Sequence, residues 1–312
     1  MKKKILALTK ADKMVISILT AVIIIAAAAA LASCSTDDPE DGRVNVSVGA
    51  EPEAEPATIT FQCRGFDLRT EPFATRAELK ADGKAMTDLW VLDYMNGSLA
   101  QSAVHQTSDQ DDFGTPTLNL AVGSHHVYFI ASRGTGASLS TADHTIAFGK
   151  VLDTFYYDYA INVTASSNGT RTVTLDRVVT KFTATIQDAI PTGAATFNMT
   201  PARWYYSFDY VSGNPTTATE NQTVTIDIPS SEIGVTNEKI NIYGFSAADE
   251  WTTDITVNCK TSGSAVLGSA SITNVPLKRN RVTVFSGPLF SAEGLTTVSL
   301  STAWDTEHTG TW

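Results

Sequence analysis

Apolar and polar residues alternate at a period of two in many short runs of this chain. TVTIDIP at 223–229, KINIYG at 239–244 and DITVNC at 254–259 are three examples. In each run the apolar side chains share one face of an extended chain, because successive side chains of a β-strand point to opposite faces. Thr, Ser, Val, Ile and aromatic residues are frequent, and turn residues recur about every ten positions. This pattern predicts an all-β protein.

One stretch is apolar on both of its faces. In DLWVLDYMNGSLAQ, residues 88–101, apolar side chains occupy successive positions around Leu92. Such a run predicts a central strand that is covered on both sides. Asn96 and Gly97 follow the run, and this pair favours a type I′ turn because both turn positions need positive φ. We therefore expect the strand to fold back on a neighbour.

The alternation slips by one position in TVTLDRVVTKFTATIQD, residues 172–188. The inward set begins at Val173 and resumes out of phase at Val178, so the slip falls near Asp176 and Arg177. A β-bulge or a crossing from one sheet to another produces such a change of face. We expect one of the two at this point.

A single helix is predicted, over residues 143–155. Ile146, Val151, Leu152 and Phe155 fall loosely at helical spacing there. The rest of the chain reads as strands and turns.

The N-terminal region has the layout of an export signal. Five lysines precede an apolar run at residues 14–33, and small residues crowd the end of that run. Residues 31–34 read LASC, which resembles a lipobox, the motif whose cysteine receives a lipid and becomes the new N-terminus. We expect residues 1–33 to be a lipoprotein signal peptide and Cys34 to be lipidated. A spanning signal-anchor helix is the alternative, because about 20 apolar residues suffice to cross a bilayer.

The remaining chain divides into a linker and two expected domains. Residues 34–57 are acidic and proline-containing, too polar to fold, and predict a flexible linker. Pro191 and Gly193 mark the best domain boundary. The sequence thus predicts β-sandwich domains at 58–190 and 191–312.

Charge narrows the classes of partner. The net charge is −11, and loss of residues 1–33 would remove five lysines and one aspartate and so bring it to −15. This balance argues against nucleic acid, whose phosphates need basic partners. It also argues against electrostatic attachment to anionic lipid, so the lipid on Cys34 has to provide the anchor.

Cysteines and histidines give no sign of a metal site. Cys63 and Cys259 are far apart in sequence and lack CxxC spacing, so two unpaired buried thiols are expected, with a disulfide as the alternative. His125 and His126 are adjacent in a predicted strand and therefore point to opposite faces. We interpret them as surface or core-edge histidines.

Catalytic motifs are also missing. The sequence has no G-x-S-x-G nucleophile motif and no Ser/His/Asp set that spacing supports. Paired carboxylates of a glycoside hydrolase would leave no local spacing, and nothing positive supports them. We expect a protein that is not an enzyme and has no cofactor.

An aromatic stripe is the strongest binding-type signal. In RWYYSFDY, Trp204, Tyr206, Phe208 and Tyr210 share one face if the strand runs straight. Such a row stacks on sugar rings in some proteins, but aromatic side chains more often fill the core of a sandwich. The core interpretation is favoured, and a glycan-binding platform is the alternative.

A basic cluster stands out in the acidic chain. Lys278, Arg279 and Arg281 lie in PLKRNRV, just before a predicted strand. A solvated turn is the favoured interpretation, and a ligand patch is the alternative.

Several segments together resemble the fimbrillin proteins of type V pili. Besides the lipobox and the acidic linker, these segments are MTDLWVLDYMNG, LNLAVGSHHVYFIAS, LDRVVTKFTATIQDAIP and VPLKRNRVTVFSGPLF, in the order of the family and over most of residues 85–290. The resemblance implies two transthyretin-like β-sandwiches in tandem. It also implies a surface lipoprotein of the outer membrane that serves as a fimbrial subunit and supports adhesion.

In polymerising members of that family an arginine-specific protease removes the linker and the first strand. The emptied groove then accepts the C-terminal strand of another subunit. On this sequence the resemblance implies cleavage after Arg76, with Arg64 and Arg69 as alternatives. It implies a donor strand at 296–304, TTVSLSTAW, with inserting side chains Val298, Leu300 and Trp304.

The resemblance also implies the partners. These are other pilus subunits in a homo- or heteropolymer, the outer membrane through the lipid, and a host or bacterial surface ligand. Anchor-type members remain uncut and lipid-bound. A surface glycan-binding lipoprotein is the alternative function.

Overall fold

The computed structural model describes residues 55–64, 86–216, 218–291 and 297–300. Every regular element in these ranges is a β-strand, apart from one 3-10 turn at Ser230–Glu232. Within the same ranges, no helix has the length and apolar character needed to cross a bilayer. The predicted all-β class is confirmed.

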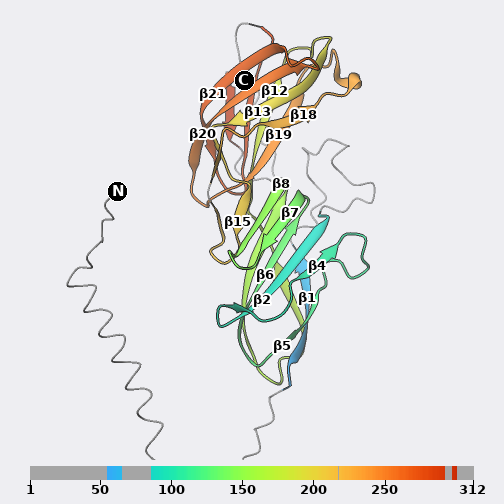
Figure 1. Ribbon diagram of the computed structural model, residues 1–312, viewed down its shortest axis with the longest axis vertical. Helices are drawn as coiled ribbons and strands as arrows, with labels where there is room; N and C mark the ends of the chain where they lie inside the picture. Colours follow the sequence, from blue (N-terminus) through green and yellow to red (C-terminus); the bar gives the residue numbers. More distant parts are fainter. Residues whose placement is uncertain (1–54, 65–85, 217, 292–296, 301–312) are drawn as a thin grey trace, which may run out of the picture. The chain divides into compact units, whose positions relative to one another are not determined.

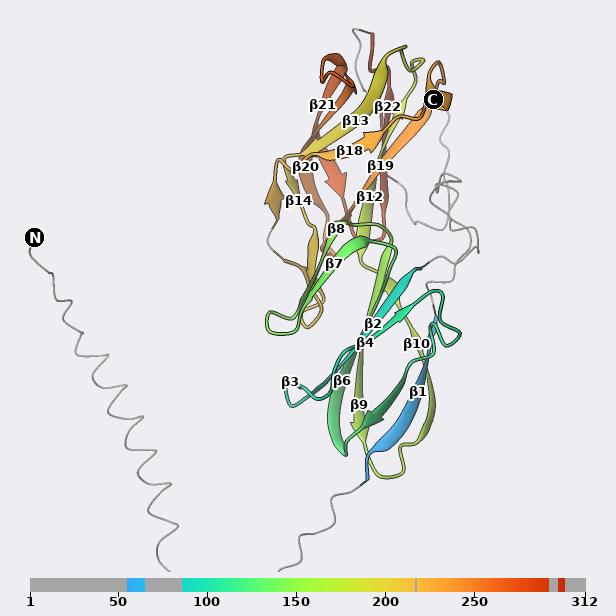
Figure 2. The ribbon, with the colours of Figure 1, turned by 45° about the vertical axis from the view of Figure 1, so that its right-hand side comes forward.

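Two sheets enclose the N-terminal core. One has the order β10-β1-β5, and the other has the order β11-β9-β6-β2-β3 with β4 also paired to β2 (Figures 1 and 2). Their inner faces share one cluster of buried apolar side chains, as in a sandwich. The strands are β1 (Ala57–Arg64), β2 (Asp88–Met95), β3 (Ser98–Leu99), β4 (Val104–Thr107), β5 (Thr117–Leu120), β6 (Gly123–Ser132), β9 (Thr154–Val163), β10 (Gly169–Thr174) and β11 (Asp176–Arg177).

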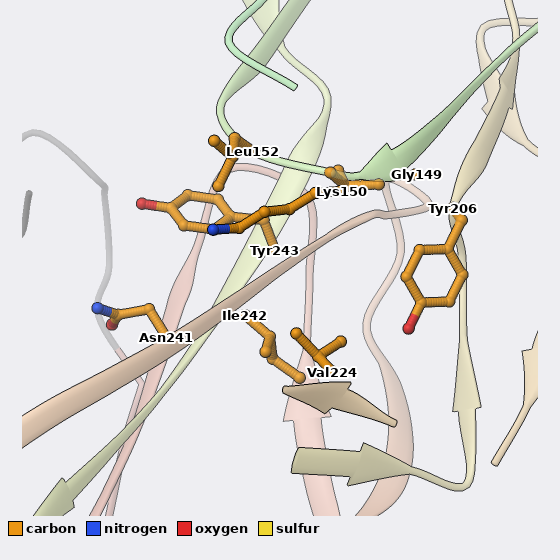
Figure 3. Close-up of a pocket in the computed structure, with 9 residues that line it drawn as sticks. Gly149, Lys150, Leu152, Tyr206, Val224, Asn241, Ile242 and Tyr243 are labelled. Atoms are coloured by element: carbon orange, nitrogen blue, oxygen red, sulfur yellow. The ribbon is translucent and has the colours of Figure 1, made fainter. Parts of the chain in front are cut away.

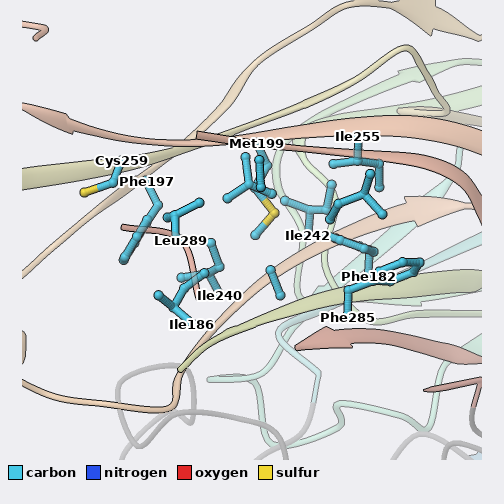
Figure 4. Close-up of a cluster of buried hydrophobic side chains, with 14 of the residues drawn as sticks. Phe182, Ile186, Phe197, Met199, Ile240, Ile242, Ile255, Cys259, Phe285 and Leu289 are labelled. Carbon is cyan, nitrogen blue, oxygen red and sulfur yellow. The ribbon is translucent and has the colours of Figure 1, made fainter. Parts of the chain in front are cut away.

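A second pair of sheets encloses the C-terminal core. Their orders are β19-β12-β22-β23 and β18-β13-β20-β21. Figure 4 shows side chains from both sheets meeting between them, including Phe182, Ile242, Ile255 and Cys259. The alternating runs predicted at 223–229, 239–244 and 254–259 supply part of this core. The strands are β12 (Val179–Ile186), β13 (Ala194–Pro201), β18 (Val224–Asp227), β19 (Glu238–Phe245), β20 (Trp251–Thr261), β21 (Val266–Leu277), β22 (Val282–Gly287) and β23 (Thr297–Leu300).

The remaining strands form two further sheets. One sheet has the order β16-β15-β8-β7, and a two-stranded sheet pairs β14 with β17. A third buried cluster, here called the junction cluster, collects apolar side chains from β2, β6, β8, β12, β15 and β19; it includes Trp90, Tyr94, Tyr128, Phe148, Phe208, Tyr210 and Phe245. The strands are β7 (Thr135–Ser140), β8 (Thr145–Lys150), β14 (Arg203–Trp204), β15 (Ser207–Asp209), β16 (Asn214–Pro215) and β17 (Thr219–Glu220).

Two local predictions are confirmed. Asn96 and Gly97 have φ of 52° and 77°, and they connect β2 to β3. The slip near Asp176 is a crossing between sheets, because β10, β11 and β12 follow one another closely in sequence but belong to three different sheets.

The predicted helix at 143–155 is wrong. Thr145–Lys150 forms β8, and Phe155 lies in β9. Ile146 and Phe148 alternate with less buried neighbours, which is the period of a strand. Pairing of β8 with β7 and β15 satisfies the backbone of this segment.

Strand pairing also bears on the domain boundary predicted after residue 190. β12 precedes that boundary, yet it pairs antiparallel with β19 and parallel with β22. A boundary before Val179 would keep β12 with its partners, whereas β8 and β15 pair across either position. The predicted boundary stays a prediction.

A buried ion pair holds the crossing between sheets. Arg177 donates from Nε to Asp153 Oδ1 (2.6 Å) and from Nη2 to Asp153 Oδ2 (3.0 Å). The two side chains are only 5% and 3% exposed. Arg177 also donates to Asn280 Oδ1 (3.1 Å), and its guanidinium lies 4.6 Å from the centre of the Phe155 ring. The pair thus connects β11 with the segment before β9 and with the turn before β22.

We expect Arg177→Ala to lower the free energy of unfolding by about 3–5 kcal/mol, because it leaves the Asp153 carboxylate buried without its cation. Urea denaturation measures this change. Arg177→Met combined with Asp153→Leu should recover most of the loss. As a control, Asp158→Asn, which disrupts the exposed His126–Asp158 pair, should cost less than about 1 kcal/mol. Equal losses from Arg177→Ala and Asp158→Asn would contradict this role.

Candidate functional site

β1 is the middle strand of its sheet. It runs parallel to β10, with Ile59 opposite Gly169, and antiparallel to β5, with Thr60 opposite Thr117. Both backbone edges of β1 are therefore paired. Removal of β1 would leave a channel between β5 and β10, here called the β1 slot, with unpaired backbone groups along both walls.

The inner face of β1 is apolar and its outer face is polar. Ala57, Ile59 and Phe61 are completely buried, whereas Thr58 and Gln62 are exposed. The Phe61 ring lies edge-on to Phe129 and Tyr159, with centroids 5.1 and 5.5 Å apart. An empty β1 slot would thus be an apolar groove.

All contacts of β1 in its sheet are made over long sequence separations. The Thr60 and Thr117 hydroxyls are hydrogen-bonded at 2.9 Å across 57 residues, and Thr58 N donates to Asn168 Oδ1 (2.7 Å) across 110 residues. β2, the next strand that the structure describes, lies in the opposite sheet. Loss of β1 therefore breaks no hairpin and leaves β5 and β10 covalently continuous with the rest of the chain.

Of the candidate cleavage and lipidation residues, the structure describes only Arg64. Arg64 is the last residue of β1, and its carbonyl accepts a hydrogen bond from Leu175 N (2.9 Å). A protease would have to release this end of the strand before cutting after Arg64. Arg69, Arg76 and the lipidation candidate Cys34 lie outside the described residues.

The candidate donor segment forms β23, which pairs antiparallel with β22 of the same chain. Leu300 lies opposite Thr283, and Val298 lies opposite Phe285. β23 is the terminal strand of its sheet among the described residues, so one ladder holds it there. Trp304 lies outside the described residues.

The aromatic stripe does not form a platform. Trp204, Phe208 and Tyr210 are at most 1% exposed. The chain bends between them, so that Trp204 packs in the C-terminal core while Phe208 and Tyr210 pack in the junction cluster. Trp204 Nε1 donates to the Tyr243 carbonyl (2.9 Å). The geometry fits the core interpretation, because a sugar ring cannot reach these faces.

Tyr206, the remaining residue of the stripe, lines a small cavity. Lys150, Leu152, Val224 and Ile242 are among the other lining residues (Figure 3). Burial raises the pKa of Tyr206 to about 12, so the phenol is neutral at physiological pH. The cavity measures about 30 Å³, which has room for one or two water molecules rather than a sugar ring.

Arg279 lies half-buried in the turn before β22 and connects this turn to two distant segments. Its guanidinium donates to the Ser246 carbonyl (2.9 Å) and to the Gly213 carbonyl (2.7 Å). Burial lowers the pKa of Arg279 from its usual value. The predicted turn before the strand is present, and within it two backbone carbonyls hold Arg279, while the ligand patch stays a prediction.

Both cysteines are unpaired. Cys63 lies in β1 and Cys259 in β20, in different sheets. Burial raises the pKa of Cys63 to about 12 and that of Cys259 to about 11. Both thiols are therefore protonated and unreactive at neutral pH, because the thiolate is the nucleophile.

The two adjacent histidines point to opposite faces, as predicted. His126 is exposed and contacts Asp158 (2.9 Å), whereas His125 is completely buried beside Asp93. The expected surface or core-edge position is thus wrong for His125. Within the described part of the chain, no three His, Cys, Asp or Glu residues are grouped to hold a metal ion.

We expect Phe61→Ala to lower the free energy of unfolding by about 3–5 kcal/mol, because it opens a cavity beside Phe129. Gln62→Ala is the matched control on the exposed face of the same strand and should change stability by less than about 0.5 kcal/mol. Denaturant titration checks both values. A loss below about 1 kcal/mol in Phe61→Ala would show that β1 contributes little to the core.

Known proteins similar to this chain include a "putative adhesin" from Bacteroides ovatus, 11% identical with a TM-score of 0.46, covering 82% of this chain and 95% of that one. The tip fimbrial protein Mfa3 from Porphyromonas gingivalis is 12% identical with a TM-score of 0.41, covering 78% and 98%. "Putative polysaccharide binding proteins" from Bacteroides thetaiotaomicron are 7% identical with a TM-score of 0.47, covering 74% and 92%. At these values the similarities carry no conclusion about function.

No curated protein matches the sequence. Residues 136–312 match a family whose description is "Family of unknown function (DUF6562)". Because this match spans more than half of the chain, the protein belongs to that family of unknown function.

Proposed function

We propose that this protein is a non-enzymatic surface lipoprotein that serves as a fimbrial subunit and joins other subunits by strand exchange. The observation that carries the proposal is the position of β1. It is a middle strand with an apolar inner face, it has no hairpin partner, and it is preceded in sequence by the acidic linker. A strand of this kind can be removed and replaced without rearranging the rest of the sheet.

In this proposal the empty β1 slot binds a strand of another subunit. An empty β1 slot exposes unpaired N–H and C=O groups and the apolar sites that Ala57, Ile59 and Phe61 occupy. A new strand satisfies both needs when its apolar residues are also spaced by two. TTVSLSTAW has this spacing through Val298, Leu300 and Trp304.

The donor segment is held less firmly than the strand that it would replace. In the described part of the chain, β23 pairs with β22 alone, whereas β1 pairs with both β5 and β10. Moving the segment from β22 of its own chain to the slot of another subunit would therefore exchange one ladder for two. This difference favours polymerisation once the slot is empty.

The N-terminal sequence supplies the attachment in this proposal. Lipid on Cys34 tethers the chain to the outer membrane, and the linker at 34–57 carries the strands away from it. Cleavage after Arg76, or after Arg69 or Arg64, would release both tether and β1 and allow assembly. An uncut chain would remain as the membrane anchor of a filament, and adhesion to a host or bacterial surface would follow from the surface location.

Cleavage is tested by mass spectrometry of the N-terminus of protein taken from the cell surface. A polymerising subunit should begin at Ala77, and Arg76→Ala should restore a chain that begins at acylated Cys34. Arg171→Ala, which changes an arginine near the start of β10, is the control and should leave the N-terminus unchanged. Retention of the apolar run at 14–33 would exclude the lipoprotein assignment.

Strand exchange is tested by electrophoresis of cell-surface protein without boiling. Deletion of residues 296–312 should abolish SDS-resistant ladders, because the slot then lacks a donor. Leu300→Asp should do the same by placing a charge among apolar side chains, whereas Ser299→Asp, on the opposite face of the strand, should leave the ladders intact. Ladders that persist after the deletion would contradict the proposed donor.

A further inference from the structure

A carboxylate just after β12 binds the backbone just after β22. Asp188 Oδ2 accepts hydrogen bonds from the amides of Leu289 and Phe290, both at 2.7 Å. These two residues lie 101 and 102 positions away from Asp188 in the sequence. Hydrogen bonds from backbone amides to an ionised carboxylate are shorter and stronger than those between neutral groups. The contact therefore holds two distant segments firmly together.

Leu289 and Phe290, here called the root, are also held by the C-terminal core. Leu289 is 3% exposed and belongs to this core, and Phe290 packs against it. Figure 4 shows Leu289 among the other side chains of the cluster. Gln187 N donates to the Gly287 carbonyl (3.0 Å), so the pairing of β12 with β22 continues almost up to the root.

β21 passes so close to the root that its backbone needs a glycine there. Gly268 of β21 lies opposite Cys259, whose side chain is in the core. A Cβ atom at Gly268 would lie 2.6 Å from the Leu289 carbonyl oxygen and 2.7 Å from the nearest Phe290 ring carbon. Cβ atoms do not tolerate such distances, so a larger residue would displace the root.

The root is fixed from three directions, whereas the strand after it has one partner. The Asp188 carboxylate holds the root amides, β21 lies against the root backbone, and the core surrounds the Leu289 side chain. β23 begins at Thr297 and, among the described residues, pairs with β22 alone. The chain should thus separate from β22 up to the root and no further.

We propose that Asp188 is a positioning residue for strand exchange, because it fixes the point at which the donor segment leaves its own subunit. The chain after Phe290 moves to the β1 slot of another subunit, while Leu289 stays in its own core. Release of β23 then frees the edge of β22 without drawing the root from the core. This role rests on the proposed function, since it takes TTVSLSTAW as the donor.

The anchorage is tested by hydrogen exchange in the purified full-length protein in detergent. Asp188→Ala should speed exchange of the root amides at least about tenfold, because both lose their acceptor. Asp188→Asn keeps an oxygen acceptor without the charge and should give a smaller increase. Asp249→Ala, which changes an exposed aspartate between β19 and β20, is the matched control and should leave the root protected.

The amides of β20 are the internal reference for these variants. A general loss of stability would speed their exchange together with that of the root, whereas loss of the anchorage alone leaves them protected. Unchanged root protection in Asp188→Ala, or an equal loss in the root and in β20, would overturn the proposal.

Independence of the root from β23 is tested by releasing this strand within the full chain. Val298→Pro with Ser299→Pro removes two successive amides, one of which faces β22, and so breaks the ladder. The root amides should remain as protected as in the wild type. Adding Asp188→Ala should expose the root and also the Gln187 amide, because the separation then extends into β22. Loss of root protection in the double proline variant would overturn the proposal, and this outcome does not require Asp188→Ala to fold.

Cell-surface ladders separate this role from the proposed function. Asp188→Ala ladders should dissociate in SDS at a lower temperature than wild-type ladders, because a donor strand with a free root can peel from the slot at that end. Asp249→Ala ladders should dissociate as in the wild type. Equal temperatures for Asp188→Ala and the wild type would overturn the positioning role. Absence of ladders from the wild type would instead remove the proposed function, while hydrogen exchange would still report the anchorage.

Discussion

The buried Arg177–Asp153 ion pair holds the point at which the chain leaves one sandwich for the other. Within a few residues β10 ends, β11 joins the sheet of β9, and β12 enters the sheet of β19 and β22. A segment that changes sheets so often cannot rely on one regular ladder. The bidentate contact to Asp153, with the bond to Asn280, gives this crossing a single geometry. β10, which forms one wall of the β1 slot, ends just before this crossing.

β1 combines two properties that usually exclude each other. Its inner side chains are as deeply buried as any in the core, yet all its sheet partners are distant in sequence. The buried side chains of β1 fill the core, so the sandwich is closed only when the strand is present. Because no turn joins β1 to β5 or β10, the strand can leave the sheet without breaking a hairpin. An assembly that proceeds by replacing one strand with another needs both properties.

The chain bends between Trp204 and Phe208, because this bend allows all the large rings on either side of it to be buried. Trp204 finds an acceptor in the Tyr243 carbonyl, and Tyr210 shares a hydrogen bond of 2.9 Å with Tyr94. Large rings with a polar tip gain most when the ring is buried and the tip is paired. The stripe is therefore divided between two clusters, although its sequence spacing would suit one flat face.

Sequence alone determined the features that depend on neighbouring residues. Alternation marked the faces of β19 and β20, Asn96-Gly97 specified a turn with positive φ, and the slip at Asp176 located the crossing. These follow from local geometry, since side-chain direction and turn conformation need no distant partner. Only the tertiary structure decided which strands pair, and this is why Ile146 lies in a strand rather than a helix. It also decided that Arg279 binds carbonyls and that His125 is buried with Asp93, because burial and hydrogen-bond partners are supplied by segments far away in the sequence.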